Sequence, residues 1–339
     1  MQKIQKRASE FSIHRSSVTP LASSTILRMT ITCRIPAGLH LQVHARKSIT
    51  AVILPLAASL LSFATVSRTQ VVVVPVANMY SAASDKAGVV SQAIYGSNVL
   101  LVVSRGEWSR IETPEDHYKG WTRSRYLRIV QSGEGYATSG RTVQVEGLFA
   151  NIYREPDVTK HQPVITIPFE SKLEVLADGT GPSQGWLQVR LPDLKAAWIQ
   201  QGDVISDPKP LTIDESIALA KRFLGLPYLW GGRSSFGFDC SGFTQMLVRS
   251  RGINMPRDAD QQAAWKGVIA VDRKDLLPGD LLFFGSSPKR ITHTALYIGD
   301  GQFVQAATND HPVVQVDRLD DEPWTHFLVA CRRVRVAHP

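Results

Sequence analysis

The chain has 339 residues, of which 43% are hydrophobic, 20% charged and 8% aromatic. This length predicts two or three domains, and the composition excludes a disordered, collagen-like or coiled-coil protein. The formal net charge of +8 is carried by residues 1–70, because residues 71–339 contain 29 basic and 29 acidic residues. A neutral body has no electrostatic footprint for nucleic acid, so no nucleic-acid partner is expected.

The first segment, residues 1–64, has the pattern of a leader that ends in a secretory signal. An apolar stretch at 49–63 follows Arg46 and Lys47 and ends with small residues at the −3 and −1 positions of a cleavage site after Ala64. This stretch is shorter than the about 20 apolar residues that a bilayer span needs. We therefore expect export to the periplasm or the cell exterior and no permanent membrane anchor; an interfacial helix behind an unstructured tail is the alternative.

Two segments of the body repeat a pattern at an offset of 73 residues. Residues 73–80 and 143–153 both run from alternating apolar positions into the tetrapeptide Ala-Asn-x-Tyr. Each repeat continues with an apolar strand, a Gly/Trp hairpin and a last strand that begins near a Trp, which predicts short antiparallel strands. Such units suit small barrels, so we expect two all-β barrels, at 71–130 and 141–206. The stretch 131–140 between them has the composition of a flexible linker.

Helices and then strands are predicted after residue 207. Thr212-Ile-Asp-Glu215 is a capping box, and apolar residues follow it at helical spacing until Gly225. A second helix is expected to start at Cys240, to be capped by Asp239 and to stop at Gly252. Strands are predicted at 280–284, 293–298, 302–306 and 327–334. Helices followed by an antiparallel sheet give an α+β unit.

Cys240 is the candidate nucleophile of this unit. In the first turn of a helix capped by Asp239, the unpaired backbone N–H groups and the helix dipole are expected to lower the pKa of its thiol. His293 opens a strand in the same unit and can act as the base, and Gln305, across a hairpin, can orient its imidazole. Cys331 falls in an apolar strand and is expected to be a core residue. No zinc or calcium spacing occurs, so no metal is expected.

Several short motifs surround these residues in one order and at close spacing. They are Tyr228-Leu-Trp230-Gly231-Gly232, Phe238-Asp239-Cys240-Ser241-Gly242-Phe243, Pro256-Arg257-Asp258, Leu277-Pro278-Gly279-Asp280-Leu281 and His293-Thr-Ala-Leu-Tyr297-Ile-Gly299-Asp-Gly301. With these motifs, residues 212–337 resemble the NlpC-type bacterial cell-wall cysteine peptidases, which have a papain-like fold. The repeats in front resemble bacterial SH3-like domains. The combination is similar to the γ-D-glutamyl-L-diamino-acid endopeptidases, also called dipeptidyl-peptidase VI.

The resemblance implies a function and a set of site residues. It implies hydrolysis of the bond after γ-D-glutamate in peptidoglycan stem peptides, through a thioester on Cys240, at the cell wall and without a cofactor. His293 is then the base, Gln305 the orienting residue and Tyr228 an oxyanion donor. The substrate cleft is then lined by Tyr118, Trp230, Asp239, Ser241 and Asp258. We expect the protein to act as a monomer.

Two positions depart from the pattern of these relatives. Gln305 stands where relatives often have His, and Ser81-Ala82-Ala83 stands where they have an acid that holds the amino terminus of the substrate. Recognition of a substrate amine is therefore expected to be weaker. Two alternatives remain: an amidase or intact-wall hydrolase on the same fold, and a non-catalytic wall-binding protein. The presence of both Cys240 and His293 favours a peptidase over the latter.

Overall fold

The computed structural model describes residues 69–130, 135–308 and 311–335. The signal segment expected at 1–64 lies outside the described residues. In the part of the chain that is described, no helix is long and apolar enough to cross a membrane.

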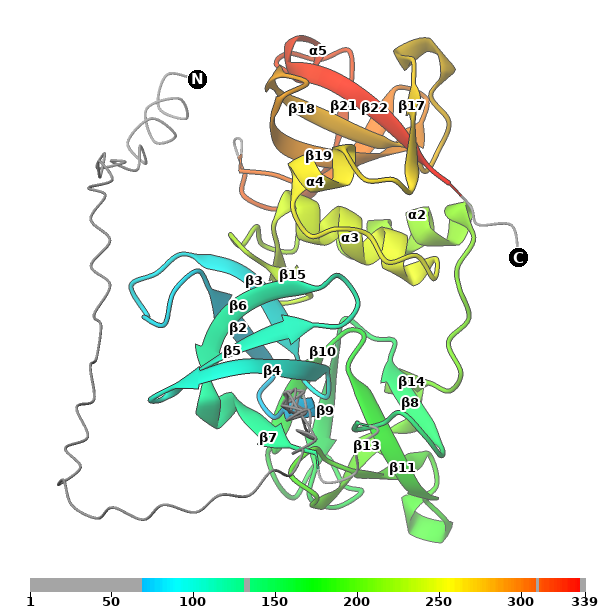
Figure 1. Ribbon diagram of the computed structural model, residues 1–339. Coiled ribbons are helices and arrows are strands. Elements are labelled where there is room, and N and C mark those ends of the chain that lie inside the picture. Colours follow the sequence, from blue (N-terminus) through cyan, green and yellow to red (C-terminus); the bar gives the residue numbers. More distant parts are fainter. Residues whose placement is uncertain (1–68, 131–134, 309–310, 336–339) are drawn as a thin grey trace, which may run out of the picture. The chain divides into compact units, whose positions relative to one another are not determined.

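Two seven-stranded antiparallel sheets come first along the chain (Figure 1). The strands of the first sheet are β1 (Thr69–Val72), β2 (Val76–Tyr80), β3 (Val89–Ile94), β4 (Asn98–Arg105), β5 (Trp108–Thr113), β6 (Tyr118–Arg123) and β7 (Leu127–Ile129). Those of the second are β8 (Thr142–Val145), β9 (Phe149–Tyr153), β10 (Ile165–Pro168), β11 (Lys172–Asp178), β12 (Trp186–Arg190), β13 (Ala196–Gln200) and β14 (Val204–Ile205). Short 3-10 turns at Ser124–Tyr126 and Gln201–Asp203 precede the last strand of each sheet.

The two sheets have equivalent strand orders, β3-β2-β6-β5-β4-β1-β7 and β10-β9-β13-β12-β11-β8-β14. Each also contains one edge-to-face aromatic pair: Tyr80 with Trp108 at 5.5 Å between ring centroids, and Tyr153 with Trp186 at 5.4 Å. The tyrosines are those of the two Ala-Asn-x-Tyr segments. The sequence repeat therefore corresponds to a repeated strand order with a repeated aromatic contact.

The expected closed barrels are corrected to open sheets. In each sheet the strand order has two unpaired ends, β3 and β7 in the first and β10 and β14 in the second. The last strands have only three and two residues. Such short strands offer too little backbone to pair on both sides, so the hydrogen-bond ladder does not close.

The segment predicted as a flexible linker is anchored in its described part. Tyr136 is buried and its hydroxyl donates to the Arg190 carbonyl of β12 at 2.6 Å. The Asn98 side chain of β4 accepts from the Tyr136 N–H and donates to its carbonyl, both at 2.8 Å. Residue composition alone cannot reveal such a contact, because Tyr136 is the single aromatic residue of an otherwise small and polar segment.

The C-terminal region combines helices with a six-stranded antiparallel sheet of order β17-β22-β18-β19-β20-β21. Its helices are α2 (Ile213–Arg222), α3 (Cys240–Ser250), α4 (Ala259–Ala263) and α5 (Trp324–Phe327). Its strands are β17 (Val268–Val271), β18 (Leu281–Ser287), β19 (Arg290–Gly299), β20 (Gln302–Ala306), β21 (Val314–Arg318) and β22 (Leu328–Val334), with a separate hairpin of β15 (Arg233–Ser234) and β16 (Gly237–Phe238). This arrangement confirms the predicted α+β unit.

The two predicted helices are confirmed. The Thr212 side chain accepts from the Glu215 N–H at 3.2 Å, and the Glu215 carboxylate accepts from the Thr212 N–H at 2.8 Å, so the capping box forms as the sequence indicates. The four predicted strands of this region correspond to β18, β19, β20 and β22. The strands β17 and β21 were not predicted from the sequence, and β21 carries Asp317, which lies beside Gln305.

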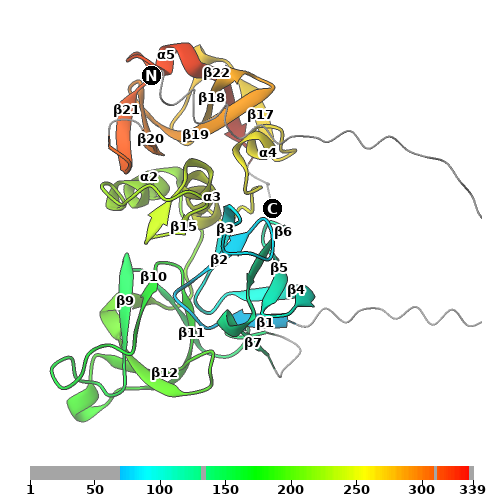
Figure 2. The ribbon, with the colours of Figure 1, turned by 90° about the vertical axis from the view of Figure 1, so that its left-hand side faces the viewer.

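Both faces of the six-stranded sheet are covered. Leu281 and Phe283 of β18 pack in the same hydrophobic cluster as helices α2 and α3, while Leu282 and Phe284 pack in a second cluster with Trp324 of α5. Figures 1 and 2 show α2 and α3 on one side of this sheet and α5 on the other. The alternation of the β18 side chains therefore fixes which face each layer occupies.

Candidate active site

Cys240 is the first residue of α3, and its neighbours hold the helix start in place. The Asp239 carboxylate caps the helix by accepting from the Gly242 N–H at 2.7 Å, and it also accepts from the Gly231 N–H at 3.0 Å. A Cβ atom on Gly242 would lie 2.2 Å from the Gly232 carbonyl oxygen. Gly242 is thus required by the close approach of the Gly232 backbone to the first turn of α3.

Arg257 lies beneath this helix start and is almost completely buried. Its guanidinium donates to both oxygens of Asp239, at 3.0 and 2.7 Å, and to the Ser241 hydroxyl at 2.8 Å. It also donates to the Ser91 hydroxyl of β3 at 3.2 Å, which connects the helix to the first seven-stranded sheet. Asp239 and Ser241, predicted to contact substrate, therefore have a clear structural role in this network, and their contact with substrate stays a prediction.

His293 and Gln305 are brought together by neighbouring strands. Leu296 of β19 pairs with Val304 of β20, a register that places His293 and Gln305 on the same face of the sheet. The His293 Nε2 atom is hydrogen-bonded to the Gln305 side-chain oxygen. The Gln305 amide nitrogen donates to the carboxylate of Asp317 on β21. The pair that the sequence predicted thus forms, and Asp317 joins it.

The ring of His293 is packed between aromatic side chains. It stacks on Trp324 with 5.6 Å between ring centroids and an angle of 27°, and it lies 5.7 Å from the ring of Phe284. This role of Trp324 was not predicted, because the residue lies 31 positions from His293 in a segment without a motif. This packing limits rotation of the imidazole.

Helix α3, which begins at Cys240, packs against β19, the strand that carries His293. The backbone N–H groups of Ser241 and of Thr294, the residue after His293, lie near enough to the Cys240 sulfur to lower the pKa of its thiol. Within the described residues no hydrogen bond joins the Cys240 Sγ to the His293 ring. Hydrogen bonds of this kind are often long in unliganded enzymes and tighten with substrate.

The predicted lowering of the Cys240 pKa is wrong. Burial and the nearby Asp239 carboxylate raise the pKa of Cys240 to about 12, against the backbone N–H groups of Thr294 and Ser241 and the charge of Arg257, which lower it. The prediction considered the helix start alone, whereas desolvation of a thiol that is 8% exposed outweighs it. The resting side chain is therefore a neutral thiol.

The imidazole beside it is also neutral. Burial lowers the pKa of His293, and the hydrogen bond to Gln305 and the charges of Asp239 and Asp317 only partly offset this. A neutral imidazole can accept a proton. The site thus combines a neutral Cys240 thiol with a neutral His293 imidazole. In such a pair the thiol proton is transferred to the imidazole while the sulfur attacks a substrate.

Tyr228 lies close enough to Cys240 for the two groups to affect each other electrostatically. Burial, followed by Cys240 and Asp239, raises the pKa of Tyr228, so its phenol remains protonated. A protonated phenol donates a hydrogen bond. This is the property that an oxyanion donor needs, and the role of Tyr228 stays a prediction.

The predicted cleft residues include one pair that joins two regions of the chain. The Tyr118 hydroxyl at the start of β6 donates to the Asp258 carboxylate, with 3.2 and 3.3 Å to its two oxygens. Burial raises the pKa of Asp258. Trp230, by contrast, is 71% exposed and has no such partner among the described residues.

The acidic residue that follows Ser81-Ala82-Ala83 in the same loop is Asp85, and it is already part of an ion pair. Asp85 forms an ion pair with Arg123, which lies over the Trp108 ring at 4.3 Å. Asp85 is therefore held at β5 and β6 and does not replace the acid expected of relatives.

Cys331, the other cysteine of the described residues, lies in the hydrophobic core. Cys331 is buried in the cluster around Trp324, as expected of a core residue, and both Cys240 and Cys331 are free thiols. In the described part of the chain, no group of three or more His, Cys, Asp or Glu side chains could hold a metal ion.

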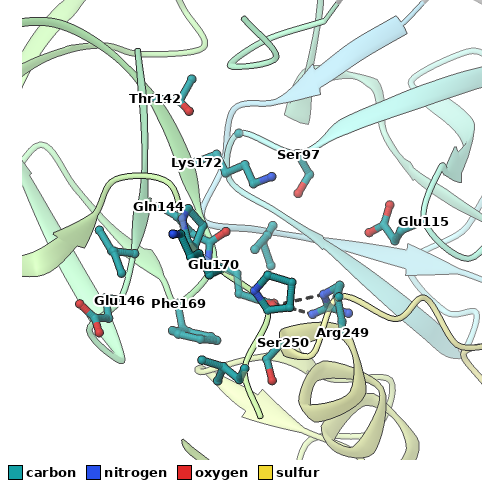
Figure 3. Close-up of a pocket in the computed structure, with 18 of the residues that line it drawn as sticks. Ser97, Glu115, Thr142, Gln144, Glu146, Phe169, Glu170, Lys172, Arg249 and Ser250 are labelled. Atoms are coloured by element: carbon teal, nitrogen blue, oxygen red, sulfur yellow. Dashed lines mark hydrogen bonds and ion pairs between the residues drawn. The ribbon is translucent and has the colours of Figure 1, made fainter. Parts of the chain in front are cut away.

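A cavity of about 1140 Å³ lies away from these groups. It is lined by residues of both seven-stranded sheets and of α2 and α3, and the ion pair between Glu170 and Arg249 crosses it (Figure 3). Its lining contains both acidic and basic side chains, among them Glu115, Glu146 and Lys172. Cys240 and His293 do not line this cavity, so the chemistry is assigned to the start of α3 instead.

Comparison with known proteins agrees with this geometry. Residues 225–333 match the NlpC/P60 family, and residues 79–127 match the bacterial dipeptidyl-peptidase Sh3 domain. The chain is 33% identical over 237 residues to a γ-D-glutamyl-L-lysine dipeptidyl-peptidase of Bacillus cereus, a match that covers 66% of this chain and 68% of that protein. A protein of the same name from Bacillus subtilis is 31% identical over 254 residues, covering 72% and 80% of the two chains.

A solved structure of an NlpC/P60 family protein from Bacillus cereus is also similar. It has a TM-score of 0.68 and 26% identity, and the match covers 79% of this chain and all of that one. The fold and the site define a peptidase of the cell-wall hydrolase class. The chain belongs to the NlpC/P60 family, with an SH3-like domain in front of the catalytic domain.

Proposed function

We propose that the protein is a cysteine endopeptidase that hydrolyses the γ-D-glutamyl–diamino acid bond of peptidoglycan stem peptides. Cys240 is the nucleophile, His293 the general base and acid, and Gln305 the group that orients the imidazole. The observation that carries this proposal is the packing of α3, which begins at Cys240, against β19, whose His293 is hydrogen-bonded to Gln305.

The reaction follows from the protonation states of the two groups. The His293 imidazole accepts the Cys240 proton as the sulfur attacks the carbonyl carbon of the γ-D-glutamyl group. The neutral Tyr228 phenol donates to the oxyanion that develops. The imidazolium then gives its proton to the departing amine, which leaves a thioester on Cys240. Water, activated by His293, hydrolyses the thioester and releases the carboxylic acid.

The names of the similar Bacillus proteins support this choice of bond. Tyr118 and Asp258 form a pair at the rim that can receive the amino terminus of a short peptide, since a carboxylate and a phenol oxygen both accept from an ammonium group. The second sheet, at 141–206, serves as a second SH3-like domain, for which its equivalent strand order is the support. Family membership supports a place at the cell wall, and the protein acts there as a monomer.

Mass spectrometry of reaction products tests the proposal. Purified protein is incubated with L-Ala-γ-D-Glu-L-Lys, with its meso-diaminopimelate counterpart, with an N-acetylmuramyl peptide and with intact wall. Release of L-Ala-D-Glu from the free peptides supports the proposal. Release of a peptide with an intact amino-terminal alanine from the muramyl substrate indicates an amidase, products from intact wall alone indicate a wall hydrolase, and binding to wall without cleavage of any substrate indicates a wall-binding protein.

A further inference from the structure

The side chain of Gln305 has a carboxylate on one side and an imidazole on the other. It is completely buried, so both ends of its amide need partners. Its amide nitrogen donates to Asp317, and its oxygen faces the Nε2 atom of His293. These three side chains lie in one row across β19, β20 and β21.

The carboxylate decides which end of the amide faces which partner. An ionised carboxylate only accepts hydrogen bonds, so the group of Gln305 that faces Asp317 must be the NH2 group. The Gln305 oxygen then faces His293, and an amide oxygen also only accepts. The His293 Nε2 atom must therefore carry the proton, which leaves Nδ1 with the free lone pair.

The register of β20 with β21 places Gln305 next to Asp317. Gln305 pairs with Gln315, and Phe303 pairs with Asp317, so Gln305 and Asp317 are diagonal neighbours on one face of the β20–β21 hairpin. The Gln315 amide donates to the same Asp317 oxygen at 2.8 Å. Asp317 is thus held by the side-chain amides of Gln305 and Gln315. If the carboxylate is removed, the NH2 group of Gln315 is available to donate a hydrogen bond to Gln305.

We propose that Asp317 is a positioning residue that selects the Nε2–H tautomer of His293 through the Gln305 amide. The inference deepens the proposed function, because the selected tautomer leaves Nδ1 free to accept the Cys240 proton. Without Asp317, the Gln315 amide can attract the Gln305 oxygen, the Gln305 amide can rotate, and its NH2 group then faces His293. That arrangement favours the Nδ1–H tautomer, which cannot act as a base toward Cys240.

The tautomer is measured directly in the full chain. Two-bond proton–nitrogen spectra of protein labelled with nitrogen-15 histidine distinguish the two neutral forms, and the His293→Gln variant identifies the signals of His293. We expect the Nε2–H form in the parent and in Asp317→Asn, because an asparagine oxygen can still accept from Gln305. We expect the Nδ1–H form, or a mixture, in Asp317→Ala.

Kinetics provide the second readout. An incorrect tautomer of a catalytic histidine can cost up to about 10^4-fold in turnover, so Asp317→Ala should lose at least about 10^2-fold in kcat with little change in KM, whereas Asp317→Asn should stay within about tenfold of the parent. Asp317→Ala should add no further loss to Gln305→Leu, because both act through one amide. Asp320→Ala is the matched control, since this carboxylate is 73% exposed and pairs with Arg273.

The outcomes separate this inference from the proposed function. An Nδ1–H form in the parent, or an unchanged Nε2–H form in Asp317→Ala, would overturn the role of Asp317 whatever the substrate is. If Asp317→Ala does not fold, Asp317→Val repeats the test with a residue suited to an edge strand. Failure of the parent to cleave any stem peptide would refute the proposed function, and the spectra would still decide the tautomer.

Discussion

The C-terminal α+β region and the first seven-stranded sheet contribute to the site in different ways. The groups assigned to the reaction all lie in the C-terminal region, on α3, β19, β20 and the loop before β15. The first sheet contributes the Tyr118 contact to Asp258 and the Ser91 contact to Arg257. The groups proposed for the reaction thus lie within one region, while the Tyr118–Asp258 contact proposed to receive the substrate joins two.

The second sheet makes this contrast sharper. It has the same strand order as the first and the same aromatic pair, and its contacts to the C-terminal region are supportive ones, such as the Glu170 pair with Arg249. Two similar sheets thus occupy different positions relative to the chemistry. A division of this kind predicts that substitutions in the C-terminal region change turnover and that those in the first sheet change substrate choice.

The largest effect is expected for Cys240→Ala. Removal of the nucleophile should lower turnover on the order of 10^6-fold, while the melting temperature stays near that of the parent because α3 keeps its Asp239 cap. Release of dipeptide from L-Ala-γ-D-Glu-L-Lys, followed by mass spectrometry, measures the loss.

Cys331→Ala is the matched control for this variant. Cys331 is the other free thiol of the described residues and lies in the hydrophobic cluster of β18 and β22. We expect unchanged chemistry and a small loss of stability from the cavity. Turnover in Cys240→Ala similar to that of the parent would rule out a thioester on Cys240.

The next largest effect is expected at Gln305. Gln305→Leu removes the acceptor for the His293 Nε2–H and should lower kcat by about 10^2- to 10^4-fold. Gln305→His should remain active, because a second imidazole can accept the same hydrogen bond. Equal turnover in Gln305→Leu and the parent would mean that the aromatic packing against Trp324 is sufficient to orient His293.

The contrast between the two regions also explains what the sequence could reveal. Cys240, Asp239, Gly242 and their helix lie in one contiguous motif whose capping and close approach are local properties, so the element and the residue could be predicted together. The hairpin from β19 to β20 is local as well, and its spacing predicted the pairing of His293 with Gln305.

Features that depend on contacts between distant segments could not be predicted in this way. Asp317 lies in the alternating stretch Val314–Arg318, which is recognisable as a strand only once β20 is known to need a partner. The high pKa of Cys240 arises from burial by several elements, whereas the local pattern contains only the helix start. The open sheets likewise result from how short the last strand of each repeat is, which residue composition does not determine.

The pH dependence of kcat/KM should reflect the neutral states of the Cys240 thiol and the His293 imidazole. The pKa of His293 is lowered, so the imidazole is a competent base above that value, and kcat/KM should fall only when the pH drops below the ordinary histidine range of about 6.5. The pKa of Cys240 is raised to about 12, so the thiol should add no descending limb near pH 8.5, the ordinary thiol value.

A substrate without a free amino group separates the titration of the enzyme from that of the substrate. The substrate α-amino group titrates at about pH 8, so the alkaline side of the profile is measured with single-turnover kinetics on an N-acetylated peptide. A descending limb near pH 8.5 with that peptide would indicate a resting thiolate–imidazolium pair instead of the neutral pair described above.

The smallest effect is expected at the rim, where Tyr118 donates to Asp258. Tyr118→Phe keeps the ring and removes the hydroxyl, whereas Tyr118→Ala also removes the aromatic wall, so the two variants separate the hydrogen bond from the shape of the cleft. A hydrogen bond to a charged group contributes about 1.5 to 3 kcal/mol, so the preference for a free amino terminus over its N-acetylated form should fall by at most roughly 10- to 150-fold. The kcat/KM for glycan-linked peptide should rise in Tyr118→Ala alone, because only that variant widens the entrance of the cleft.

The measurement is kcat/KM for the free, the N-acetylated and the glycan-linked peptide in the parent and in both variants. Equal values for all three in the parent would mean that the first sheet does not select substrates, and its role would then be to tether the protein to the wall.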